Sequence, residues 1–139
     1  MASVHGRGAA FKLDDSGASL RDLSSYVDNV DFPQTAATAE DTAFGDNSQS
    51  FIAGLKTATI SISGNFDSQA TTGPDVVIQG VVGGSAGTFE FGPEGGTGGD
   101  VKYSGECICT SYQAGAPVGD KVSFSAEFQV TGDVTRGTF

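Results

Sequence analysis

Two segments of the chain alternate regularly between apolar side chains and short polar ones. They span residues 56–67 and 121–131, and many of their polar positions are serine or threonine. A period of two is typical of a strand that buries one face and exposes the other. In the second segment the apolar face would carry Val122, Phe124, Ala126, Phe128 and Val130. We therefore expect two long strands that contribute to one hydrophobic core.

Shorter strands are predicted on either side of these two. Residues 9–13, 87–93 and 101–112 are apolar or alternating runs, and aspartate, serine or glycine residues lie next to them. Such residues are common in turns and bound strands in sequence. Glycine-rich residues 94–100 connect the last two runs, so these two runs are expected to form a hairpin.

Two further segments are ambiguous. The apolar positions of residues 19–32 fit a helix or a strand, but serine, aspartate and asparagine are poor helix formers. We favour a short strand or turn followed by an extended strand over residues 26–34. Residues 74–84 begin with proline and end with glycines, which predicts a short helix, while their four valines leave a strand as the alternative. The helix would have an apolar stripe of Val76, Val77, Gly80 and Val81.

The composition indicates one mainly β domain. The chain has 139 residues, 21 glycines and a hydrophobic content of 37%, which fits many turns and a thin sandwich or small barrel. Three segments have too few apolar side chains to become ordered by burial. We expect a flexible N-terminal arm at residues 1–8, a mobile segment at residues 35–54 and a loose C-terminal tail at residues 132–139.

The charge of the chain argues against nucleic-acid binding. Seven basic and 17 acidic residues give a net charge of −10, whereas phosphate binding requires clustered lysine and arginine. A surface past which DNA slides without binding remains compatible with this charge. No apolar run approaches the roughly 20 residues of a membrane span, and no signal-peptide pattern follows Met1. A soluble protein that is not exported by that route is expected.

The two cysteines, Cys107 and Cys109, are two positions apart in a predicted strand. Their side chains would point to the same face of a rigid backbone, so a disulfide between them would be strained. The only histidine, His5, lies far away in the N-terminal arm and is poorly placed to complete a metal site. We expect both thiols to be small buried hydrophobic groups of a protein made in a reducing cytoplasm.

No pattern of catalytic or cofactor-binding residues is present. Adjacent acids occur at residues 14–15 and 40–41, but 17 carboxylates make such pairs inevitable. The glycine-rich run at residues 95–99 joins two strands and lacks the Lys-Ser/Thr sequence of a phosphate-binding loop. We predict no catalytic, metal or cofactor site.

The strand edges indicate self-assembly. Monomeric β proteins usually protect edge strands with lysine, proline or bulges. Each of the two regular strands has only one lysine, near its start. These edges, together with the weakly apolar segment at residues 35–54 and the two termini, could become ordered against a neighbouring copy.

Several short blocks occur in an order that covers nearly the whole chain. They are residues 11–15, 26–33, 39–46, 51–55, 89–93, 101–106 and 122–132. In this succession the sequence resembles the major tail tube proteins of long, non-contractile-tailed bacteriophages.

This resemblance implies a β-sandwich or half-barrel with one short flanking α-helix, a fold shared with the tube protein of type six secretion systems. Six copies would form a ring, rings would stack into a hollow tube, and DNA would pass through it to the host. The implied partners are further copies of the chain, the tape-measure protein, and the tail-tip and tail-terminator proteins. The resemblance implies no enzymatic activity, cofactor or membrane, and a location in the virion tail after assembly in the host cytoplasm.

The resemblance also suggests roles for two sets of residues. A long loop that reaches a neighbouring subunit or ring maps to residues 35–54. Its contact candidates are Glu40, Asp41, Phe44, Phe51, Ile52 and Leu55. Polar strand faces would line the lumen, where carboxylates and hydroxyls repel DNA phosphates. The lumen candidates are Thr57, Thr59, Ser61, Ser63, Ser123, Ser125, Glu127 and Gln129.

Two other classes of protein compete with this interpretation. A capsid decoration protein or adhesin-like β-sandwich would form closed oligomers of fixed size, whereas a tube subunit forms stacked rings. A hydrolase that uses a pair of acids would need two carboxylates facing each other in a cleft.

Overall fold

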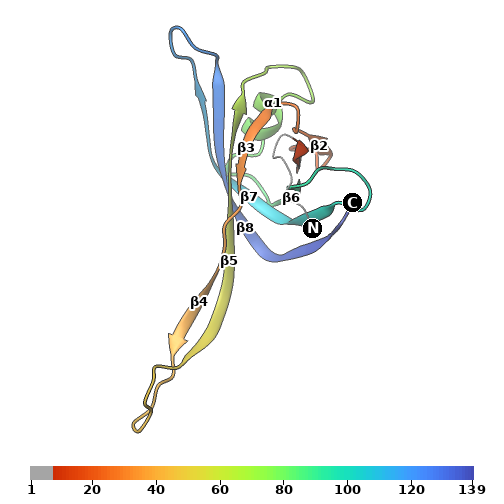
Figure 1. The fold of residues 1–139 in the computed structure, drawn as a ribbon. Helices are drawn as coiled ribbons and strands as arrows, with labels where there is room; N and C mark the ends of the chain where they lie inside the picture. The colour runs from red at the N-terminus through yellow and green to blue at the C-terminus, as the bar shows by residue number, and fades with distance from the viewer. Residues whose placement is uncertain (1–7) are drawn as a thin grey trace.

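The computed structural model describes residues 8–139, and Figure 1 shows their fold. The predicted flexible arm at residues 1–8 lies outside the described residues, apart from Gly8. Eight strands and one short helix are present in the described chain. They are β1 (Ala10–Asp14), β2 (Leu20–Asp22), β3 (Val27–Asp31), β4 (Gln34–Glu40), β5 (Phe51–Asn65), α1 (Pro74–Gln79), β6 (Gly87–Gly92), β7 (Val101–Gly115) and β8 (Ser123–Thr138).

All the strands belong to one antiparallel arrangement. The order across the sheet is β2-β1-β6-β7-β8-β5-β3, and β4 pairs with the outer part of β5. The sheet curls over its own core, which brings β1 against β8 although the two strands are not neighbours in the sheet. The rings of Phe11 and Phe128, one from each of these strands, have centroids 6.4 Å apart. The fold is therefore a mainly β half-barrel with one flanking helix, as the sequence predicted.

Alternation along β5 and β8 produces the centre of this core. Ile60 lies opposite Phe128, and Ile62 lies opposite Ala126, in the ladder between the two strands. All four side chains are buried. The two regular segments of the sequence are thus the two central strands, and they share one buried face.

Strand β3 approaches β5 closely at Gly64. A Cβ atom at this position would lie 2.1 Å from the carbonyl oxygen of Tyr26 and 2.8 Å from the Cα of Val27. The pairing of β3 with β5 is also irregular between Val27 and Asn29. Only glycine fits this crossing, since any side chain would collide with backbone atoms.

The extended strand expected over residues 26–34 is instead two strands, β3 and β4. They are separated at Pro33, which has no N–H to donate to a ladder. The carbonyl oxygen of Pro33 still accepts a hydrogen bond of 3.2 Å from the Thr59 N–H. β3 and β4 therefore follow the same side of β5, one along each half of that strand.

Helix α1 is present where the sequence predicted it, and the predicted apolar stripe is right for Val77 and Val81 but wrong for Val76 and Gly80. Val77 and Ile78 face the core, whereas Val76 is 44% exposed. The hydroxyl of Tyr112 in β7 donates a 3.0 Å hydrogen bond to Asp75 Oδ1. This contact fixes the rotation of a helix of only six residues, so Val76 lies on the solvent side.

Two segments that were expected to be loose are paired strands. Half of residues 35–54 belongs to the two strands of the β4–β5 hairpin, whose ladder runs from Gln34 opposite Ala58 to Glu40 opposite Phe51. Residues 41–50 form the loop at its tip. β8 continues through the predicted tail to Thr138. Backbone ladders order both segments, and a prediction based on side-chain burial does not count those hydrogen bonds.

The side chain of Phe139 is also held in place. Its ring lies 5.5 Å from each of the amines of Lys12 and Lys102, which come from β1 and β7. Its N–H donates to the carbonyl oxygen of Asp100, and its own carbonyl oxygen accepts from Gly99, both at 3.0 Å. Cation–π contacts and these hydrogen bonds therefore tie the end of β8 to the β6–β7 connection.

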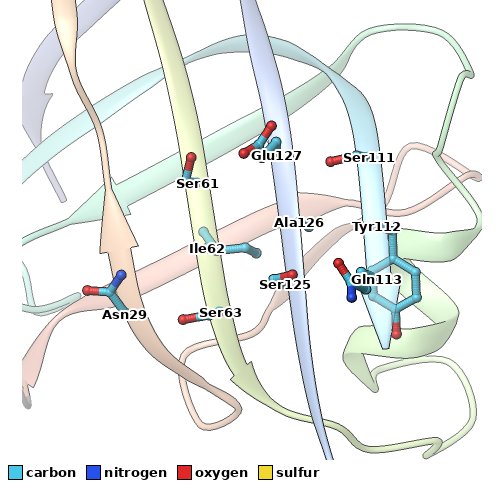
Figure 2. Close-up of a pocket in the computed structure, with 10 residues that line it drawn as sticks. All are labelled: Asn29, Ser61, Ile62, Ser63, Ser111, Tyr112, Gln113, Ser125, Ala126 and Glu127. Carbon is cyan, nitrogen blue, oxygen red and sulfur yellow. The ribbon is translucent and has the colours of Figure 1, made fainter. Parts of the chain in front are cut away.

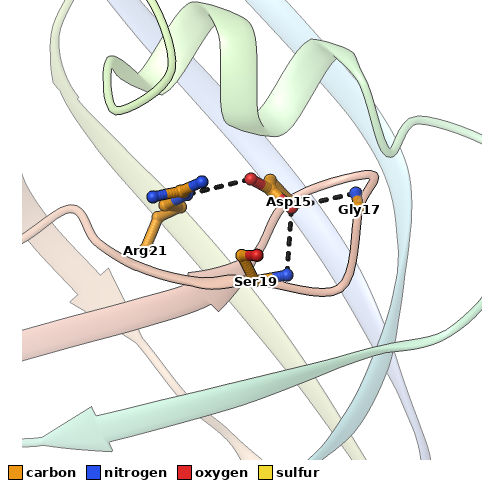
Figure 3. Close-up of polar contacts among 4 residues, drawn as sticks. All are labelled: Asp15, Gly17, Ser19 and Arg21. Carbon is orange, nitrogen blue, oxygen red and sulfur yellow. Dashed lines mark hydrogen bonds and ion pairs between the residues drawn. The ribbon is translucent and has the colours of Figure 1, made fainter.

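The β1–β2 turn is organised by the side chain of Asp15, as Figure 3 shows. Its Oδ1 accepts hydrogen bonds from the N–H groups of Gly17 at 2.9 Å and Ser19 at 3.0 Å. Its Oδ2 accepts one of 2.9 Å from Arg21 Nε. The hydrogen bond from Arg21, followed by that from Ser19, lowers the pKa of the Asp15 carboxyl.

Candidate assembly surfaces

Four strands present a continuous polar face on the side of the sheet opposite the core. They are β3, β5, β8 and β7, in that order across the sheet. Cross-strand partners form two rows on this face. The first row is Asp31, Ser61, Glu127 and Ser111, and the second is Asn29, Ser63, Ser125 and Gln113. Figure 2 shows most of these side chains along a shallow, open hollow.

Most of the predicted lumen residues lie together on this polar face. Besides the two rows, Thr59 is paired with Gln129. Ser123 lies at the end of the same ladder, opposite Asn65. Thr57 lies outside the ladder with β8 and forms a 2.8 Å hydrogen bond with Thr35 of β4.

The sequence prediction missed four members of the two rows. Asn29 and Asp31 belong to the ambiguous segment, where alternation was noticed but not assigned to a face. Ser111 and Gln113 follow a register shift in β7 between Cys109 and Ser111, where the ladder to β8 skips one residue. Such a bulge changes which face the following side chains occupy. A single alternation over residues 101–112 therefore could not place them.

Carboxylates give the polar face its charge. Asp31 and Glu127 are the charged members of the two rows, and no lysine or arginine belongs to either row. At the margin, Asp28 accepts hydrogen bonds from Ser63 Oγ at 3.3 Å and Lys121 Nζ at 3.1 Å. Small hydroxyl and amide groups occupy the other positions. The face is therefore hydrophilic, and both charged side chains of its two rows are negative.

The two margins of the polar face are unpaired strand edges. β3 is the last strand of the sheet and pairs only with β5. On the other margin, β6 pairs with β7 only as far as Cys107. Beyond that point, among residues 8–139, an isolated bridge from Val82 to Cys109 is the last backbone pairing on this edge. Within the described chain, residues 110–115 of β7 therefore have no strand partner on this edge, as β3 has none on its outer edge, and such edges can pair with another chain.

The β4–β5 hairpin projects away from the body as a long arm, which we define as residues 34–57 (Figure 1). Every residue of the arm is exposed. Its largest apolar side chains are strongly exposed, at 109% for Phe44, 83% for Leu55, and 55% each for Phe51 and Ile52. Four of the six predicted contact residues are therefore apolar groups that this chain does not bury by itself.

The other two predicted contact residues, Glu40 and Asp41, lie where the hairpin ends. Thr42 Oγ1 donates a 3.2 Å hydrogen bond to Glu40 Oε2, and the Asp41 N–H donates one of 2.9 Å to the carbonyl oxygen of Ser50. These contacts close the base of the loop that carries Phe44.

A bulge in the arm changes which way its side chains point. Between the pairs Ala36–Lys56 and Thr38–Ala53, β5 contributes one residue more than β4. The alternation along β5 therefore shifts by one position, as is typical of a bulge. Phe51 and Ala53 consequently lie on the side of the sheet that carries the core, whereas Ile52 lies on the side of the polar face.

The cysteines and the adjacent acids Asp14 and Asp15 are buried in the core or hydrogen-bonded to the backbone. Cys107 and Cys109 are free and buried, as predicted, and burial raises the pKa of the Cys107 thiol to about 12. Asp14 Oδ2 accepts a 3.1 Å hydrogen bond from the Thr88 N–H, while Asp15 organises its turn. Within residues 8–139 no three His, Cys, Asp or Glu side chains are grouped closely enough to hold a metal ion.

Helix length gives one more result. No helix in the described part of the chain is long and apolar enough to span a membrane.

No family model and no curated protein matches the chain. Solved structures do match it over almost its full length. One is the tail of an empty gene transfer agent particle, computed with helical refinement and C6 symmetry. It has a TM-score of 0.81 and 17% identity, and the match covers 98% of this chain and 100% of that one.

Two other structures show the same fold. The SPP1 tail tube has a TM-score of 0.78 and 11% identity, with 99% of this chain and 80% of that chain covered. A sheath–tube complex of an extracellular contractile injection system has a TM-score of 0.70 and 9% identity, with 99% and 93% covered. The chain therefore has the fold found in phage tail tubes and contractile injection systems, which is the fold that the sequence resemblance predicted.

Proposed function

We propose that this protein is a structural subunit of a phage tail tube, in which rings of six copies stack into a hollow conduit for DNA. The observation that carries this proposal is the combination of a tail tube fold with a polar, acidic sheet face bounded by two free strand edges. No residue is assigned a catalytic role. The proposed location is the virion tail, after assembly in the host cytoplasm.

Pairing of the two free edges would close the ring. β3, β5, β8 and β7 alternate in direction, because each neighbouring pair is antiparallel. In a ring with rotational symmetry, β7 of one copy then runs opposite to β3 of the next copy. The two edges can therefore form an antiparallel ladder that continues the pattern within each subunit. Six copies would join their sheets into one continuous inner barrel.

The polar face would line the lumen of this barrel. Its carboxylates, Asp31 and Glu127, would be repeated around the tube and would repel DNA phosphates. Hydroxyl and amide groups between them keep the wall wet without the clustered cations that bind a phosphate backbone. The proposed lumen residues are the predicted Thr57, Thr59, Ser61, Ser63, Ser123, Ser125, Glu127 and Gln129, joined by Asn29, Asp31, Ser111 and Gln113.

The arm would make the contact with a neighbouring subunit or ring, through its exposed phenylalanines, Ile52 and Leu55. Burial of exposed aromatic and aliphatic side chains is the main source of affinity in such contacts. The tape-measure, tail-tip and tail-terminator proteins are the further partners of this proposal, with DNA passing through without specific binding.

Negative-stain electron microscopy over a concentration series tests the proposal. Hollow six-fold rings or tubes are expected from the purified protein. A matched variant that lacks residues 46–50 and carries Phe51→Asp should remain a folded monomer. Small closed particles of one size would support a decoration or adhesin-like protein instead. Normal tubes from the variant would contradict the role of the arm.

A further inference from the structure

Large exposed apolar side chains are concentrated at two opposite ends of the molecule. In Figure 1 the arm extends from one end of the body, whereas α1, β2 and the β7–β8 hairpin lie toward the other end. The arm carries Phe44, Phe51, Ile52 and Leu55, and the other end carries Leu20, Val76, Val82, Val118 and Val122. Soluble monomers seldom expose large apolar patches. Two different patches at opposite ends suit a head-to-tail contact between copies, which propagates instead of closing.

Two residues of the second end lie on α1 or just after it, and we call them the α1 shoulder: Val76 and Val82. Val76 and Gly80 lie one turn apart on the helix. A Cβ atom at Gly80 would be 3.7 Å from the Cβ of Ser16, in the turn before β2. Figure 3 shows the helix beside this turn. Leu20, which begins β2 after this turn, lies opposite Asp14 on the face of β2 away from the core and is not part of the α1 shoulder. The two valines are each 44% exposed.

The α1 shoulder and Phe51 lie on the same side of the sheet. α1 covers the core side, where Tyr112 of β7 reaches it through the hydrogen bond to Asp75. The bulge in β5 places Phe51 on the core side as well, opposite Glu40. Phe51 can therefore face the outer body of a stacked copy, while the polar face of the arm stays in line with the proposed lumen.

We propose, building on the proposed tube function, that Phe51 of one copy packs on the α1 shoulder of a second copy in the adjacent ring. Val76 and Val82 form the receiving surface. A single arm offers less apolar area than the roughly 800 Å² per partner of a stable pair. Six such contacts between two rings act together and gain from multivalency. Stacking therefore depends on prior formation of the ring.

Disulfide trapping tests this contact, because both native thiols are buried. A protein with Phe51→Cys is mixed with one carrying Val76→Cys, assembled, oxidised and analysed on a non-reducing gel. The control mixture pairs Phe51→Cys with Val118→Cys, which is 105% exposed at the same end but outside the α1 shoulder. We expect covalent dimers from the Val76 mixture and only background from the Val118 mixture. Dimers confined to the Val118 mixture would overturn the proposal.

A second measurement separates this inference from the proposed function. Val76→Asp should give a folded protein that forms rings but no stacked tubes, since Val76 contributes nothing to the core. Normal tubes from Val76→Asp would overturn the docking inference alone. So would the absence of covalent dimers from the mixture of Phe51→Cys and Val76→Cys when the wild type forms tubes. Failure of the wild type to form rings or tubes at any concentration would overturn the proposed function as well.

Discussion

Strand β5 has two halves with opposite surroundings. Over residues 59–65 it pairs with β8, and with β3 from Ser61 to Gly64, and every second residue from Ala58 onward is buried. Over residues 51–57 it pairs only with β4, and every residue is exposed. Both halves belong to one continuous strand, so backbone hydrogen bonds to β4 are enough to keep the outer half extended without buried side chains. The comparison shows that side-chain burial separates the body, which has its own core, from an arm whose apolar side chains stay exposed in the single chain.

Substitution of one glycine in each half should give the largest difference in the free energy of unfolding between the two halves. In the body, Gly64→Ala would place a Cβ atom 2.1 Å from the Tyr26 carbonyl oxygen. In the arm, the nearest atom to a Cβ at Gly54 is the Ala37 carbonyl oxygen, at 3.2 Å. We expect Gly64→Ala to lower the free energy of unfolding by about 3 kcal/mol, and Gly54→Ala by less than about 1 kcal/mol. Urea denaturation of the monomer measures both values, and equal losses would contradict the contrast.

Truncation of one apolar side chain in each half should also separate them. Ile60 is 1% exposed and Leu55 is 83% exposed. Ile60→Ala should lower the unfolding free energy by about 2–5 kcal/mol, while Leu55→Ala should change it by less than about 0.5 kcal/mol. Chemical denaturation at a concentration below assembly gives these values. A loss above about 1 kcal/mol for Leu55→Ala would show that the arm packs on its own body.

The body was also the part of the molecule that the sequence predicted well. Alternation in β5 and β8 identified the buried face, because one side of each strand meets the core. The arm was predicted as a mobile segment because it has few apolar side chains. Its strands are instead held by backbone hydrogen bonds, which a pattern of apolar residues does not reveal. Two bulges, in β5 near Leu55 and in β7 near Thr110, were also invisible in the pattern. They decide which residues reach the polar face and where Phe51 points.

The buried thiols of the body give a smaller, pH-dependent effect. Burial raises the pKa of Cys107 from 9.0 in the reference state to about 12. The folded state therefore keeps this proton where the unfolded chain releases it. Stability from this group is fully present below pH 9 and is lost as the pH rises toward 12. The expected loss at pH 10 is about 1 kcal/mol.

The control for this effect is Cys107→Ala, which removes the titrating thiol. Urea denaturation of both proteins at several alkaline pH values gives two slopes of unfolding free energy against pH. The wild-type slope should be steeper between pH 9 and pH 12. Parallel slopes would show that Cys107 is not buried in this way, and rapid labelling of the folded protein by a thiol reagent would lead to the same conclusion.

The smallest effect is expected at the turns of the two regions, each of which is organised by one aspartate. Asp15 accepts three hydrogen bonds in the β1–β2 turn, and Asp46 Oδ2 accepts one of 2.7 Å from the Ala43 N–H at the tip of the arm. Asp15→Asn should lower the melting temperature slightly, because the amide loses the ion pair with Arg21. Since its pKa is lowered in the fold, Asp15 contributes above the unfolded pKa, and this contribution disappears as the pH falls. The wild type and Asp15→Asn should therefore converge in acid. Asp46→Asn should melt at the same temperature as the wild type, because the residues at the arm tip are exposed and pack on nothing in the monomer. Divergence of the Asp46 variant in thermal melts would mean that the tip already contacts the body before assembly.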